Sequence, residues 1–119
     1  PRLLACVNAQ SGTAKAVLAN QRFSINLLAP SQQQLAERFA SRTITGDERF
    51  QADGWQAGDT GVPILTDATA VFQCRLVDHQ ASASHLILIG ECGSITHAPD
   101  PALIYRNGVF SAAGTAATP

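Results

Sequence analysis

Strand-like segments joined by short polar turns constrain the fold of this chain more than any other feature of its sequence. Residues 23–28 alternate apolar and polar side chains, which is typical of a strand with one buried face. The continuous apolar run from His85 to Cys92 is typical of a central strand that is covered on both faces. Asn107-Gly108 is a strong two-residue hairpin signal. Further strands are predicted at residues 3–7, 70–79, 103–106 and 109–110. Hairpin connections without regular strand–helix alternation favour an antiparallel barrel with one or two helices over a doubly wound sheet.

Two short helices are predicted between these strands. Residues 14–21 place apolar side chains at the spacing of one narrow helical face. Ser31 followed by Gln34 matches a capping box, with the serine at the cap. The helix that follows carries an apolar stripe of Leu35, Ala36, Phe39 and Ala40, which predicts that Phe39 anchors it to the core.

Two segments break the regular pattern. Residues 41–62 are rich in glycine, aspartate and threonine around Phe50 and Trp55. Such a long connection is either a lid or binding loop, or an irregular loop that its aromatic residues anchor to the body. Order restarts at 63–65, and a polar turn is predicted at 80–84. We predict one domain over residues 1–110 and a low-complexity tail over 111–119, expected to be an arm or a loose end.

Composition excludes several classes of function. The chain has 119 residues, a formal net charge of −1 and only 14% charged residues, so no polybasic surface favours nucleic acid or an anionic membrane. No apolar run is long enough to span a bilayer. Cys6, Cys74 and Cys92 lie in apolar strand-like runs without metal-ligand spacing, which favours reduced cysteines and a cytoplasmic location. Paired carboxylates, a metal-binding Cys/His cluster and a glycine-framed serine nucleophile are missing from the sequence.

A polar loop after the first predicted strand is the first candidate site. The run of residues 3–7 ends at Asn8, and a helix follows the loop, so backbone N–H groups and the positive end of the helix dipole face one spot. Ser11 and Thr13 add hydroxyl donors there, and Lys15 adds a positive charge. These are the components of a phosphate-binding corner. The residues alone favour the simpler interpretation, in which Ser11 or Thr13 caps the helix, because caps far outnumber phosphate sites.

His85 is the second candidate because it begins the strand that is predicted to be most buried. A histidine at this position can meet a ligand seated at the end of the barrel. A boundary residue without a function is the alternative.

Taken in order, these features resemble the flavin reductase family with the FMN-binding split-barrel fold, whose members supply reduced flavin to two-component monooxygenases. The matching segments run from Leu3 to Phe110. They are Asn8-x-x-Ser11-x-Thr13, Phe23-Ser24-Ile25-Asn26-Leu27-Leu28, Leu35-Ala36-x-x-Phe39-Ala40, Arg49-Phe50 with Trp55, Gly58-x-x-Gly61-x-Pro63-x-Leu65, Ser84-His85-Leu86-x-x-x-Ile89-Gly90-Glu91 and Tyr105-Arg106-x-Gly108-x-Phe110. The resemblance implies a mainly β (α+β) fold, an antiparallel six-stranded split β-barrel with flanking short helices.

The same resemblance implies roles for particular residues. Asn8, Ser11 and Thr13, with Lys15 beside them, match positions around the ribityl-phosphate arm of the flavin. His85 matches a histidine at the flavin and the nicotinamide, and is the expected catalytic residue. In the family a Gly-Asp pair commonly precedes this histidine, whereas here Ala83-Ser84 stands in its place. Tyr105 and Arg106 match a short strand near the nicotinamide.

The implied activity is transfer of a hydride from NADH or NADPH to FMN or FAD, in a homodimer that serves a separate monooxygenase. Because the cofactor supplies the reactivity, no acid–base dyad is needed. Family members begin with additional strands that contain a Thr/Ser-rich flavin-contacting segment, and we expect this domain to be N-terminally incomplete. Two alternatives stay open, a flavin-binding carrier without reductase activity and a split barrel that holds another phosphate-bearing cofactor such as pyridoxal phosphate.

Overall fold

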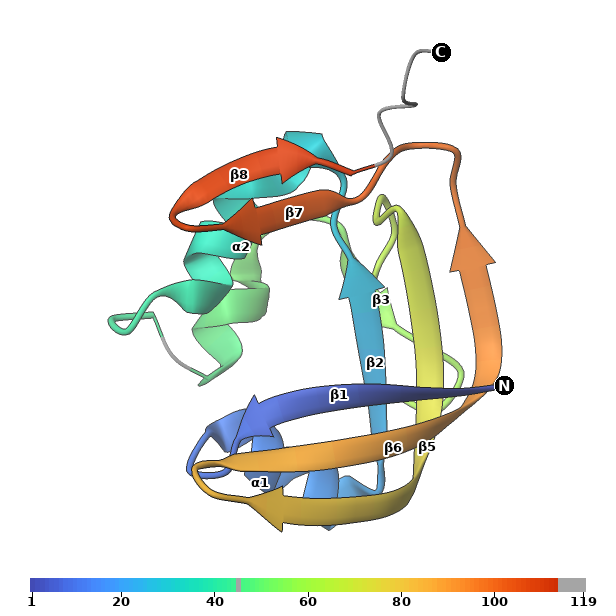
Figure 1. The fold of residues 1–119 in the computed structure, drawn as a ribbon. Coiled ribbons are helices and arrows are strands. Elements are labelled where there is room, and N and C mark those ends of the chain that lie inside the picture. Colours follow the sequence, from blue (N-terminus) through green and yellow to red (C-terminus); the bar gives the residue numbers. More distant parts are fainter. Residues whose placement is uncertain (45, 114–119) are drawn as a thin grey trace, which may run out of the picture.

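A computed structural model describes residues 1–44 and 46–113 of the chain (Figure 1). The main sheet is antiparallel and has the strand order β1-β6-β5-β2, while β3 pairs with β4 and β7 with β8. The strands are β1 (Arg2–Asn8), β2 (Arg22–Leu27), β3 (Trp55–Ala57), β4 (Pro63–Leu65), β5 (Ala70–Ser82), β6 (His85–His97), β7 (Leu103–Arg106) and β8 (Val109–Ala112). The helices are α1 (Gly12–Asn20) and α2 (Gln33–Ala40), with the short 3₁₀ helices η1 (Pro30–Gln32) and η2 (Gly46–Gln51).

The long hairpin of β5 and β6 bends sharply and gives the sheet its curl (Figure 1). Its pairing register shifts twice, between Gln73 and Cys74 and between Leu76 and Asp78. Such bulges bend a strand and increase its twist. The predicted mainly β, antiparallel split barrel with short helices is therefore confirmed as a curled half-barrel. The described residues contain eight strands instead of the expected six.

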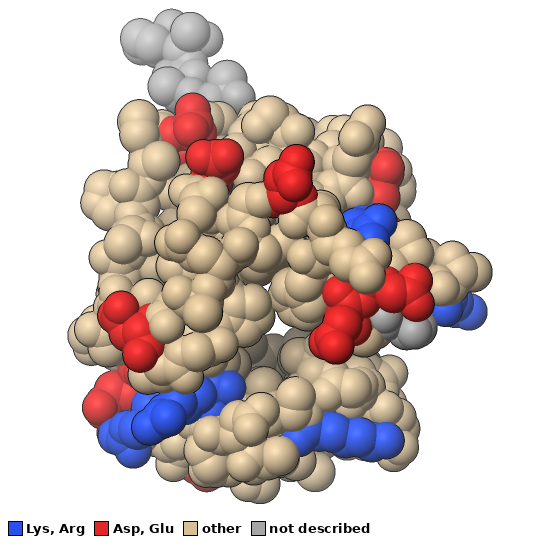
Figure 2. Space-filling view, turned by 180° about the vertical axis from the view of Figure 1, so that it is seen from behind, with Lys and Arg blue, Asp and Glu red and all other residues tan. Residues whose placement is uncertain are grey.

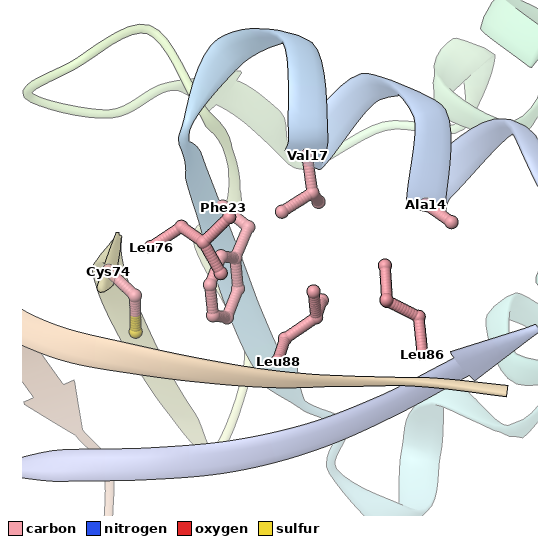
Figure 3. Close-up of a cluster of buried hydrophobic side chains, with 7 residues drawn as sticks. All are labelled: Ala14, Val17, Phe23, Cys74, Leu76, Leu86 and Leu88. Carbon is pink, nitrogen blue, oxygen red and sulfur yellow. The ribbon is translucent and has the colours of Figure 1, made fainter. Parts of the chain in front are cut away.

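Helix α1 covers the concave face of the lower half of the sheet (Figures 1 and 3). Ala14 and Val17 point from α1 toward Leu86 and Leu88 of β6, with Phe23 of β2 beside them (Figure 3). Cys74 and Leu76 of β5 complete this cluster of buried side chains. Gly90 permits the packing of the phenyl ring, because a Cβ there would lie 2.6 Å from Phe23 Cζ.

A second cluster fixes the long connection between α2 and β4. The rings of Phe39, Phe50 and Trp55 pack against one another with centroid separations of 4.9–5.5 Å. The guanidinium of Arg38 donates hydrogen bonds to the carbonyls of Glu48 and Arg49. The aromatic residues therefore anchor this connection, as one of the two interpretations of the sequence expected. It also contains η2 and β3, where an irregular loop was predicted.

Three predicted boundaries are wrong. Ser31 is not a helix cap, because the chain enters η1 at Ala29, whose N–H donates to Gln32 Oε1 at 2.8 Å. The predicted turn at 80–84 shrinks to Ala83-Ser84, since β5 continues to Ser82. The predicted tail begins later, because β8 runs to Ala112 and Ala113 N–H donates to the Ala102 carbonyl at 2.7 Å. Residues 114–119 of the predicted tail lie outside the described residues.

The described residues contain no helix that is long and apolar enough to cross a membrane. Within those residues, no group of three or more His, Cys, Asp or Glu side chains is arranged to bind a metal ion. Cys6, Cys74 and Cys92 are free thiols.

The core cluster under α1 predicts the cost of truncating its most buried large side chain. Leu88 is 1% exposed, so Leu88→Ala should lower the free energy of unfolding by about 2–5 kcal/mol through lost burial and a cavity. Urea unfolding followed by circular dichroism measures this change. Leu4→Ala is the control, because Leu4 is 61% exposed and should cost less than about 0.5 kcal/mol. Equal losses in the two variants would contradict the assignment of this core.

Candidate functional site

The loop between β1 and α1 is held by its own side chains. Asn8 Oδ1 accepts the N–H of Gln10 at 2.8 Å. Ser11 Oγ donates to the Asn8 carbonyl at 2.7 Å and accepts the N–H of Ala14 at 3.1 Å. Ser11 is therefore the N-cap of α1. The capping interpretation is correct for Ser11, whose hydroxyl serves the loop.

Other groups of this loop remain open to solvent. Thr13 and Lys15 are exposed on the first turn of α1. The first N–H groups of a helix have no partner within it, and the positive end of the helix dipole lies there. No acidic residue occupies this turn, so no carboxylate competes for these donors. The electrostatics of the corner suit an anion, with Lys15 as its charged side chain.

His85 lies directly beside this loop. β1 and β6 are antiparallel, and their register pairs Asn8 with His85. The Ala9 N–H donates to the Ser84 carbonyl at 2.9 Å, which ties the loop to the turn before His85. The imidazole is exposed, and its Nδ1 lies 2.9 Å from Ser84 Oγ. This contact restrains the orientation of the exposed ring.

The turn before His85 has the geometry that a glycine would favour. Ala83 has φ +52°, whereas Ser84 is not in the left-handed region. A two-residue hairpin turn with positive φ at its first central position is of type II′, which prefers glycine there. The positive φ of Ala83 carries local strain, because its Cβ is crowded in this conformation.

Tyr105 and Arg106 lie elsewhere in the chain. They are exposed on β7, whose hairpin with β8 lies at the opposite end of the molecule from the Asn8–His85 pair (Figure 1). The ring of Tyr105 packs on Phe110 with a centroid separation of 5.0 Å. Tyr105 and Phe110 border a hollow of about 590 Å³ between this hairpin and α2. Within one chain, Tyr105 and Arg106 therefore do not lie near His85.

The back of the molecule is hollowed between its lower layer, which contains α1, and the part above it (Figure 2). A hollow of about 280 Å³, smaller than the one beside β7 and β8, borders Phe50, Trp55 and Pro63. Among the described residues, the buried Trp55 Nε1 has no hydrogen-bond partner. The candidate corner itself is open surface.

Sequence reasoning missed two groups of the site. Ser84 acts through both its carbonyl and its hydroxyl, and Gln10 fixes the Asn8 amide through its backbone N–H. In the sequence, Ser84 stood out only because Ala83-Ser84 differs from Gly-Asp. The polar side chain of Ser84 directly before His85 was the feature that could have predicted its contact with the imidazole.

Known proteins with similar sequences include FMN reductases and the reductase component of a monooxygenase. The reductase component of 4-hydroxyphenylacetate 3-monooxygenase from Klebsiella oxytoca is 35% identical over 97 residues, which are 81% of this chain and 57% of the relative. The FMN reductase (NADH) RutF of Agrobacterium fabrum is 37% identical over 108 residues, 90% of this chain and 62% of the relative. This chain thus spans about 60% of the length of these two relatives.

Solved structures agree with this similarity. A protein from Haemophilus somnus 129PT, assigned as a flavin reductase, superposes with a TM-score of 0.88 at 32% identity, over 94% of this chain and 72% of its own. BorF, the flavin reductase component of a bacterial two-component tryptophan halogenase, gives a TM-score of 0.85 at 27% identity over the same shares of the two chains.

The sequence model of the flavin reductase like domain matches residues 1–114. This chain belongs to the flavin reductase like domain family. The predicted resemblance is thereby confirmed.

The strained turn before His85 gives a prediction about stability. Ala83→Gly should raise the free energy of unfolding by about 1 kcal/mol, because glycine adopts positive φ without a Cβ clash. Chemical unfolding measures the change. Ala81→Gly in the neighbouring strand is the matched control and should destabilise by about 0.5–1 kcal/mol. A loss of stability in both variants would refute the strained-turn assignment.

Proposed function

We propose that this chain belongs to an NAD(P)H-dependent flavin reductase that transfers hydride from a nicotinamide to FMN or FAD. The reduced flavin would serve a separate monooxygenase. Relatives named FMN reductase (NADH) support FMN and NADH as the pair. A relative named as the reductase component of a monooxygenase supports the partner.

The pairing of Asn8 with His85 is the observation that carries the proposal. The loop that follows Asn8 and the His85 imidazole therefore lie side by side. This proximity supports a site in which an anion-binding loop and an imidazole act on one ligand. The exposed Thr13 hydroxyl, the Lys15 ammonium and the first N–H groups of α1 would hold the phosphate of the flavin. Asn8 and Ser11 would act by shaping the loop, because their side chains are already hydrogen-bonded within it.

The bound flavin supplies the hydride acceptor, so the protein needs to bind and orient the reactants. His85 is the proposed catalytic residue. Its Nδ1 is engaged by Ser84, so Nε2 is the ring atom that would face the reactants. The exposure of the corner means that the bound rings, and not a preformed pocket, would displace its water.

We also propose a homodimer. The β7–β8 hairpin exposes Ile104, Tyr105 and Val109 to 42%, 64% and 63%, a concentration of apolar surface that a second copy could cover. Roles of Tyr105 and Arg106 near the nicotinamide stay proposals, and would require the site of one copy to receive them from the other. The three free thiols support a cytoplasmic location.

The role of His85 is tested in the full-length protein. His85→Ala should lower kcat/KM for NADH oxidation with added FMN about tenfold, which corresponds to about 1.4 kcal/mol of lost transition-state stabilisation. His79→Ala is the matched control, since His79 is exposed on the same hairpin away from the Asn8 loop, and it should leave the rate unchanged. An unchanged rate in His85→Ala would remove His85 from the mechanism. Tight flavin binding without NADH or NADPH oxidation by the parent protein would favour a flavin carrier.

Dimerisation is tested by size-exclusion chromatography with light scattering. Val109→Asp should shift the protein toward the monomer, because it buries a charge in the proposed interface. Ala16→Asp, on the exposed face of α1, should leave the dimer intact. A monomeric parent protein, or a Val109→Asp dimer as stable as the parent, would contradict the proposed interface.

A further inference from the structure

Two cysteines face each other across the bend of the long hairpin. Cys74 of β5 and Cys92 of β6 are partners in the pairing register, and their Sγ atoms lie 3.7 Å apart. In Figure 3 the sulfur of Cys74 points toward the β6 ribbon. Both are free thiols, and Cys74 is also part of the core cluster under α1.

The backbone geometry brings these side chains unusually close. The Cys92 N–H donates to the Pro1 carbonyl at 2.9 Å, so the hydrogen-bonding groups of Cys92 face away from β5. Cys74 and Cys92 therefore form a non-hydrogen-bonded pair, in which Cα atoms are about 4.5 Å apart and side chains lie closest. Disulfides span Cα separations of about 4.4–6.8 Å, so the backbone needs no large movement.

The register shift next to Cys74 supplies the remaining freedom. A bulge leaves one residue outside the regular ladder, and the shift falls between Gln73 and Cys74. A disulfide needs the two sulfurs at about 2.05 Å, which side-chain rotation with a small backbone adjustment at the bulge can reach.

We propose that Cys74 and Cys92 are a site of reversible oxidation, which a hydroperoxide converts into an intramolecular disulfide across the bend of β5 and β6. The inference concerns the sheet alone and does not rest on the proposed flavin reductase activity.

The oxidation balances in two steps. Cys92 Sγ first attacks one oxygen of the hydroperoxide, the O–O bond breaks, and Cys92 becomes a sulfenic acid while the peroxide is reduced to water or an alcohol. Cys74 Sγ then attacks the sulfur of Cys92, the S–S bond forms, and the hydroxyl group leaves as water with the proton of the Cys74 thiol. Two thiols and one hydrogen peroxide give one disulfide and two waters.

Exposure decides this order of attack. Cys92 is half-buried, whereas Cys74 is only 5% exposed. Burial, followed by the hydrogen bond to Cys92 and the charge of Cys92, raises the pKa of the Cys74 thiol to about 12. Cys74 therefore meets little peroxide, so Cys92 is oxidised first. Cys74 keeps its proton until it attacks the sulfenic acid of Cys92, whose departing hydroxyl takes that proton, so Cys74 is the resolving cysteine.

The test uses the whole chain with the Cys6→Ser substitution, since Cys6 is exposed and has no cysteine partner in the described residues. The variant is treated with hydrogen peroxide under native conditions and then analysed by intact mass and peptide mapping. We expect a loss of two hydrogen atoms and a linked peptide pair that contains residues 74 and 92. The disulfide should raise Tm by at least about 5 °C, because it restrains the unfolded hairpin. Dithiothreitol should reverse both changes.

A second variant keeps the experiment decisive. Adding Cys92→Ala to Cys6→Ser should abolish the mass loss, the linked peptide and the rise in Tm. Three results would each overturn the proposal. The first is sulfinic acid at Cys92 beside a free Cys74, and the second is a disulfide between two molecules. The third is that both thiols stay unmodified at peroxide levels that oxidise Cys6 in the parent protein.

Discussion

The bend in the β5–β6 hairpin is the constraint on which the rest of the structure depends. β1 pairs with β6 from His85 to Glu91, whereas β2 pairs with β5 from Ala70 to Arg75. The bend divides the hairpin into two arms, one next to its turn and one next to its open end. β1 extends the first arm and β2 extends the second, and the register shifts between the two arms turn them toward each other. A straight hairpin would place β1 and β2 on one flat sheet. The bent one creates the concave face that α1 fills, and it brings the start of α1 beside the hairpin turn.

Much of this fold could be predicted from sequence, because its buried faces leave a periodic signal. The alternation of 23–28 and the apolar run from His85 predicted β2 and the first half of β6. The end of β5 left no such signal, since residues 78–82 are exposed on both faces and are held by backbone hydrogen bonds to β6. The predicted cap at Ser31 failed for a different reason, because a 3₁₀ turn at Pro30 moved the helix entry upstream to Ala29.

One part of the candidate site could be predicted from neighbouring residues, whereas the other part depends on strand pairing between distant segments. The loop from Asn8 to Lys15 was predictable, because strand, cap and helix follow one another directly in the sequence. Its proximity to His85 arises from the antiparallel pairing of β1 with β6, which no local pattern encodes. The resemblance to flavin reductases suggested that proximity without explaining it. The structure also shows how the turn accommodates Ala83-Ser84, since only one of its two residues has a positive φ and Ser84 makes a polar contact with the imidazole.

One hairpin therefore carries two chemically distinct positions. His85 stands at its turn, and the cysteine pair stands at its bend, seven residues further along β6 or about 23 Å for an extended strand. Between them the strand is paired on both sides, with β1 and with β5, and it carries the most buried side chain of the core. A bond at the bend would restrain the angle between the two arms, while the turn is held separately by the Ala9–Ser84 hydrogen bond. Oxidation at the cysteines should accordingly act on the stability of the curl, and chemistry at His85 should depend on the local contacts of its own turn.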